Sequence, residues 1–176
     1  HVLGGEPLLQ KEFQQTIDFW DNHPNPSLTL NFISNLNLPP ESFRKRIQNL
    51  ERLVKEHKIY QVEITASLDC WGPQQDYVRW GMDLENTFVP NFEYLLAQPW
   101  IRTAIHSCIT SLTIKTMPEM IEKINEWNTR SQEPIDFSFD LIVGKSWLEN
   151  GMHPLFFGPN VFDEDLQRAI ALMPTV

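Results

Sequence analysis

The feature that most constrains the fold is a strict alternation of strand-like and helix-like segments along the 176 residues. Short apolar or alternating runs, typical of strands, lie at 1–3, 28–33, 60–67, 101–109 and 135–143. A segment with apolar residues at helical spacings of three and four follows each run, and Thr116 and Glu119 have the spacing of a capping box in one of these segments. Such alternation predicts an α/β architecture with parallel strands and right-handed crossovers.

The expected strands carry polar residues at every second position. Parallel strands covered by helices on both faces usually read as continuous apolar runs, so one face of this sheet must meet something other than helices. A barrel with a polar interior fits the alternating helices better than a sheet with one face in solvent. We therefore predict a single domain over residues 1–176 that forms a partial TIM-type (β/α) barrel. The polar positions are Gln61, Glu63, Thr65, Ser67, Arg102, His106, Cys108, Asp136, Ser138 and Asp140.

Sites in such barrels gather at the C-terminal ends of the strands. The segment Gly4-Gly5-Glu6-Pro7 lies at such an end, between a strand-like run and a helix. Two glycines let a ligand lie against the backbone, whose carbonyl groups can accept hydrogen bonds from an ammonium group. A tight strand-to-helix turn is the alternative reading. Further polar residues expected at strand ends are Asn35, Ser67, Asp69, His106, Thr110 and Asp140.

Several segments, in the same order along the chain, resemble the radical S-adenosylmethionine (SAM) superfamily. Residues 1–9, His-Val-Leu-Gly-Gly-Glu-Pro-Leu-Leu, resemble its second strand with the GGEP-type motif. Residues 33–35 resemble the end of its third strand, and residues 64–72 the end of its fourth. Residues 76–83, Asp-Tyr-Val-Arg-Trp-Gly-Met-Asp, and residues 145–174 resemble a subgroup with a C-terminal twitch-type (SPASM-like) extension. The resemblance thus covers most of the chain.

The resemblance implies a SAM-binding barrel. Gly4, Gly5 and Glu6 would bind the amino group of SAM, Ser67 its ribose or carboxylate, and Arg79 its carboxylate through a planar fork. The other residues implied in cofactor binding are Asn35 and Asp69. In the intact enzyme, SAM would be cleaved reductively to a 5′-deoxyadenosyl radical that abstracts hydrogen from a substrate, either a peptide or a small molecule. Candidates for holding that substrate are Glu63, His106, Ser138 and Asp140.

Structural roles are the alternatives for several of these residues. Ser67 could cap a turn, Arg79 could lie on an exposed helix face, and Asp69 could hold the following turn by an Asx-type bond. His106 could be a hydrogen-bonded histidine of the barrel interior without a catalytic role. No residue is assigned to catalysis from the sequence.

One departure from the family is serious. The family holds a 4Fe–4S cluster with a CxxxCxxC motif after the first strand, whereas this chain has two cysteines, Cys70 and Cys108, and no such motif. A cluster of this kind needs at least three thiolates, so the chain is not expected to ligate a metal. The expectation is an N-terminally truncated barrel that lacks the first βα unit and is inactive alone, with the cluster held upstream in the intact protein.

Composition excludes other classes. Fourteen basic and 23 acidic side chains give a net charge of −9, which disfavours nucleic-acid binding. The sequence contains no run of about 18 apolar residues, so no membrane span is expected. Two isolated cysteines fit a reducing cytoplasmic setting better than a disulfide framework.

Two other functions stay open at this point. A barrel hydrolase could use Glu63 and Asp140 as acid and base, with some of the six tryptophans stacking on sugars. Trp20 and Trp127 fall on apolar helix stripes, which weighs against that use. A non-catalytic α/β interaction module is the other alternative, and it predicts no small-molecule binding.

Overall fold

Within the described part of the chain, the fold is built on one parallel sheet of four strands, whose order β1-β2-β3-β4 follows the sequence. A computed structural model describes residues 6–142 and 151–173. The strands are β1 (Asn25–Ser34), β2 (Ile59–Ser67), β3 (Ile101–Ile109) and β4 (Asp136–Leu141). The predicted parallel α/β architecture is therefore confirmed. The strand expected at residues 1–3 lies outside the described residues.

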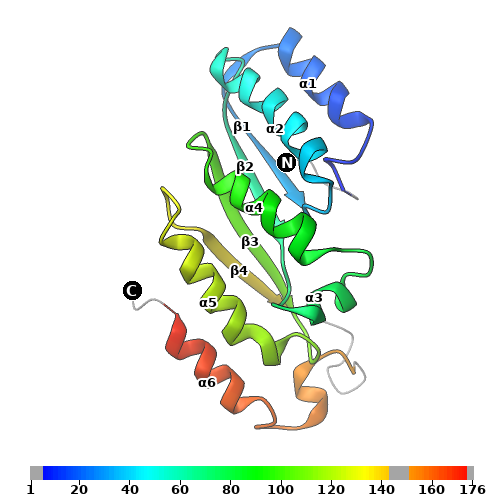
Figure 1. Cartoon of the computed structure of the whole chain (residues 1–176), viewed down its shortest axis with the longest axis vertical. Coiled ribbons are helices and arrows are strands. Elements are labelled where there is room, and N and C mark those ends of the chain that lie inside the picture. The colour runs from blue at the N-terminus through cyan, green and yellow to red at the C-terminus, as the bar shows by residue number, and fades with distance from the viewer. Residues whose placement is uncertain (1–5, 143–150, 174–176) are drawn as a thin grey trace.

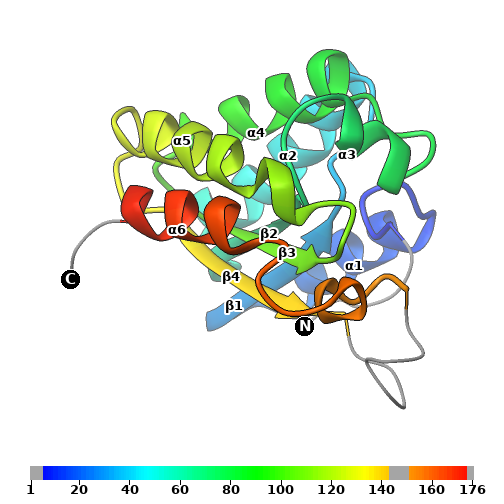
Figure 2. The ribbon, with the colours of Figure 1, turned by 90° about the horizontal axis from the view of Figure 1, so that it is seen from below.

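In the described residues, five helices of eight residues or more accompany the sheet: α1 (Glu12–Asn22), α2 (Pro40–Lys55), α4 (Val89–Leu96), α5 (Met117–Asn128) and α6 (Asp163–Leu172). When each strand pairs with the one before it, right-handed crossovers bring the connecting helices to the same side of the sheet. Figure 2 shows α2, α4, α5 and α6 on one side, and Figure 1 shows α1 next to α2. One side of the sheet is thus the helix side, and we call the other the open side.

Short helices fill the loops at the C-terminal ends of the strands. They are α3 (Pro73–Val78), the π-helix η1 (Leu84–Phe88), and the 3-10 helices η2 (Ile114–Thr116) and η3 (Pro154–Phe157). Gly72, with φ of 90°, precedes α3 in a conformation that favours glycine. The capping box expected at Thr116 is wrong, because its hydroxyl donates to the carbonyl of Thr113 and caps no helical amide.

The hydrophobic core lies between the sheet and the helices. Phe32, Ile64 and Ile105 project from three neighbouring strands and are fully buried. On the helices, Trp127 is also fully buried, and its ring centroid lies 4.7 Å from that of Phe92. This apolar layer holds the strands together and sets the position of their C-terminal ends.

The open side carries the polar half of the alternating pattern, as predicted. In β2, Val62, Ile64 and Ala66 are buried, whereas Glu63 and Ser67 are half-exposed. The alternation places Tyr60 on the same face as these apolar residues and predicts that it is buried. It is instead 66% exposed, at the start of the strand. Among residues 6–142 and 151–173, no helix has the length and apolar character needed to cross a membrane.

Candidate functional site

The carboxylate of Glu6 fixes the N-terminal segment to the end of β1. One of its oxygens accepts a hydrogen bond from Ser34 Oγ at 2.6 Å, and the other accepts one from the amide of Asn35 at 2.7 Å. The amide of Leu8 also donates to this carboxylate at 3.3 Å. Two of the predicted site residues, Glu6 and Asn35, therefore lie together. Gly4 and Gly5 lie outside the described residues.

Asp69 and Arg79 form an ion pair at the end of β2. Arg79 donates from Nε and Nη2 to the two Asp69 oxygens at 2.7 and 3.0 Å, in the bidentate geometry that suits a guanidinium. The amide of Cys108 donates to the same carboxylate at 2.8 Å. Only 10% of the Asp69 side chain is exposed, against 31% for Arg79. The pair thus joins the segment after α3 to the ends of β2 and β3.

The side chain of Gln75 fixes the backbone at Asp69 and Cys70, next to this ion pair. Its side-chain oxygen accepts hydrogen bonds from the amides of Asp69 and Cys70, each at 3.0 Å, and the residue is fully buried. Sequence reasoning missed Gln75, since a glutamine in a short polar segment gives no sign of burial. Asn91 has a similar role, because its amide group donates to the carbonyls of Leu36 and Leu38 at 2.8 Å.

His106 lies on the open side between two residues of β4. Its Nδ1 is 3.0 Å from Ser138 Oγ, and its Nε2 is 3.5 Å from an Asp140 oxygen. The side chains of His106 and Asp140 are 40% and 80% exposed. Residues 138 and 140 share a face of β4 because side chains alternate along a strand. The structure therefore brings together three of the four predicted substrate-binding residues.

The open side of β2 has a different character. In the described part of the chain, the side chains of Glu63 and Ser67 form no hydrogen bond or ion pair with one another or with other residues. Glu63 pairs in register with Arg102, yet that guanidinium donates to Asp136 at 3.1 Å. Ser67 pairs in register with His106. A carboxylate and a hydroxyl are thus available on β2 beside an already paired stripe on β3 and β4.

The two cysteines do not suit an iron–sulfur cluster. Burial raises the pKa of the Cys70 thiol to about 11, and burial also raises the pKa of Cys108. Metal ligation needs the thiolate form, which these environments disfavour. No group of three or more metal-ligating side chains occurs within residues 6–142 and 151–173.

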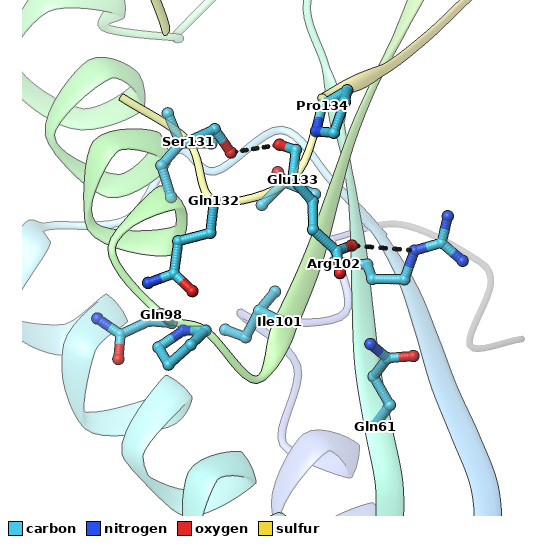
Figure 3. A pocket seen from close by; sticks show the side chains of 11 residues that line it. Gln61, Gln98, Ile101, Arg102, Ser131, Gln132, Glu133 and Pro134 are labelled. Atoms are coloured by element: carbon cyan, nitrogen blue, oxygen red, sulfur yellow. Dashed lines mark hydrogen bonds and ion pairs between the residues drawn. The ribbon is translucent and has the colours of Figure 1, made fainter. Parts of the chain in front are cut away.

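A small polar pocket lies at the other end of the strands, where β3 and β4 begin (Figure 3). It has a volume of about 50 Å³ and is lined in part by Gln61, Gln98 and Arg102. Arg102 Nε approaches a Glu133 oxygen at 4.0 Å across it. A volume of this order holds a water molecule or two, far less than a nucleoside. This pocket is separate from the predicted site.

The polar residues at the C-terminal ends of the strands form one row across the sheet, which we call the rim. The rim consists of Glu6 and Asn35 beside β1, Ser67 on β2 and Asp69 two residues after it, His106 on β3, and Ser138 and Asp140 on β4. Glu63 belongs to the same side of the sheet but lies four positions before Ser67. No protein-family model, curated protein or solved structure matches this chain. Its function is therefore inferred from the residues and geometry of the rim.

Proposed function

We propose that this chain is the SAM-binding part of a radical SAM enzyme and belongs to a partial TIM-type barrel. The observation that supports this most is the rim. Near the C-terminal ends of β2, β3 and β4, Ser67, His106 and Asp140 lie on the open side, where no helix of the described residues covers the sheet. Enzymes built from βα units bind their ligands at such ends. Glu6 is the third residue of the GGEP-type segment, and its carboxylate is bonded to Ser34 and to the amide of Asn35 at the end of β1.

Each cofactor-binding residue has a distinct task in this proposal. Glu6, held by Ser34 and Asn35, orients the backbone that meets the amino group of SAM. Ser67 offers a hydroxyl group to the ribose or carboxylate. Arg79 uses one N–H of Nε and one of Nη2 for Asp69, so three of its five N–H donors remain for the SAM carboxylate.

SAM yields radical chemistry only together with a reduced iron–sulfur cluster, and the thiols of this chain do not suit such a cluster. We therefore assign the binding of SAM and substrate to this chain and expect no reductive cleavage by the chain alone. Substrate would lie on the open side, against Glu63 and the His106–Ser138–Asp140 group. The hydrolase alternative has less support, because Trp127 is buried in the core and Trp20 packs against it.

Calorimetric titration with SAM tests the proposal. We expect the wild-type chain to bind, and Ser67→Leu to bind at least about tenfold more weakly, because it loses a hydrogen bond and fills the space beside His106. Ser27→Leu is the matched control, since Ser27 is exposed near the other end of β1 and should bind like wild type. Gly5→Val should also abolish binding. Absence of heat with wild type, or equal affinities for both leucine variants, would count against the proposal.

A further inference from the structure

An apolar trough runs along β4 on the helix side of the sheet. One part has a volume of about 440 Å³ and lies between Phe139 and Leu141 of β4 and Leu166 and Ile170 of α6. A second part, of about 310 Å³, continues beside Phe137, and Met173 lines both. The trough therefore extends over the whole length of the strand.

The walls of this trough are exposed to an unusual degree for such side chains. Phe139 and Leu141 are each 47% exposed, and Ile170 is 66% exposed. Beside them, β4 is the last strand of the sheet, and within residues 6–142 and 151–173 it pairs with β3 alone. A free strand edge next to an apolar trough is the arrangement that accepts an added strand.

The charges on β4 decide what kind of strand can be added. Asp136 and Asp140 project from the open side of β4, two positions on each side of Ser138. Their carboxylates contact Arg102 and His106 of β3, yet their side chains stay 67% and 80% exposed and can also meet an added strand. Antiparallel pairing of two copies of β4 around Ser138 would place Asp136 of one copy opposite Asp140 of the other. Like charges directly opposite one another destabilise a strand pair, and the net charge of −9 adds to the repulsion.

We propose that β4 and α6 form a docking site for an extended polypeptide segment with alternating apolar and basic residues. The segment continues the sheet along β4, with its apolar side chains in the trough against Phe139 and Ile170. Its Lys or Arg side chains lie on the open side, next to Asp136 and Asp140. A second copy of this chain is disfavoured by the same two aspartates.

A blocked heptapeptide of alternating Lys and Val, labelled with a fluorophore, tests the site. We expect its anisotropy to rise on titration with the chain, and a matched Glu–Val peptide to give no rise. In ¹H–¹⁵N spectra of the labelled chain, the shifts caused by the Lys–Val peptide should fall on residues 136–141 and 163–172.

Two variants separate the apolar and charged contributions. Ile170→Asp should abolish binding by placing a charge in the trough, while Leu9→Asp, an exposed leucine before α1, should leave it unchanged. Asp136→Asn combined with Asp140→Asn should weaken binding by about three- to tenfold through the loss of two cross-strand charge pairs. Thermal melts monitored by circular dichroism check that each variant folds.

Three results would overturn the proposal. They are absence of Lys–Val peptide binding, shifts confined to β1 at the other edge, and equal binding by the Ile170→Asp and Leu9→Asp variants. A dimer in sedimentation experiments that Ile170→Asp dissociates would replace the peptide by a second copy of the chain.

Discussion

The two sides of the sheet differ although the same four strands form both. On the helix side, Ile64 is fully buried in an apolar layer between strands and helices. On the open side, its neighbours Glu63 and Thr65 are half-exposed. Successive residues of one strand therefore face a core and a polar surface in turn. Stability should depend on the first set, and ligand binding can depend on the second without cost to the fold.

The largest difference is expected from truncations on the two faces of β2. Ile64→Ala should lower the free energy of unfolding by about 2–5 kcal/mol, because it leaves a cavity in the core. Thr65→Ala, the next residue, should change it by less than about 0.5 kcal/mol. Urea denaturation followed by tryptophan fluorescence measures both values. Similar losses for the two variants would mean that the open side is part of a second core.

Raising the pH should lower the stability of the folded chain through the buried thiol of Cys70. The Cys70 pKa is raised from 9.0 to about 11 in the folded chain, so between these pH values the unfolded chain loses a proton that the folded chain keeps. Stability from this group is complete below pH 9 and falls as pH rises toward 11, by up to about 2–3 kcal/mol. Denaturation at several pH values should show a shallower decline for Cys70→Ala than for wild type. Parallel declines would contradict the burial of this thiol.

Gln75 tests how the core supports the rim. Gln75→Leu should lower the free energy of unfolding by about 1–3 kcal/mol, because the buried amides of Asp69 and Cys70 lose their acceptor. Gln74→Leu is the control, since Gln74 is exposed in the same helix and its change should be within about 0.5 kcal/mol. Thermal denaturation compares them. Equal melting temperatures for the two variants would show that the rim does not need Gln75.

The smallest effect is expected for the ion pair on the open side. Arg102→Met removes the contact with Asp136. Because the side chains of Arg102 and Asp136 are 48% and 67% exposed, the change should lower the free energy of unfolding by at most about 1 kcal/mol. Added salt should reduce even that difference, because it screens exposed charges. Denaturation at low and high salt gives the measurement. A large loss that salt does not change would place this pair in a dry interior.

Much of the fold could be predicted because periodicity reports which side of a strand is buried. The bounds 101–109 agree with β3, and the polar residues of β2 face the side expected. β1 begins at Asn25, earlier than predicted, since Pro26 and exposed residues near its start hide the pattern of a strand. Contacts between segments far apart in the sequence could not be predicted, because they produce no periodic pattern of apolar residues.

The predicted site shows the same limit. Its residues could be named from their positions at strand ends, and several of them meet at the rim. Their partners could not be named, because hydrogen bonding depends on side-chain geometry in three dimensions. The role of Asp69 as the partner of Arg79 and the burial of Gln75 are examples. The assignment to a radical SAM enzyme stays a prediction.

The order of the strands has a consequence for how the molecule is made. Each strand pairs with the one that precedes it in the chain, so during synthesis its partner has already left the ribosome. The sheet can then grow at a single edge, one strand and helix at a time, without waiting for a distant part of the chain. Each new pairing then closes only one crossover connection, such as residues 35–58 between β1 and β2, and never a loop that spans the whole sheet.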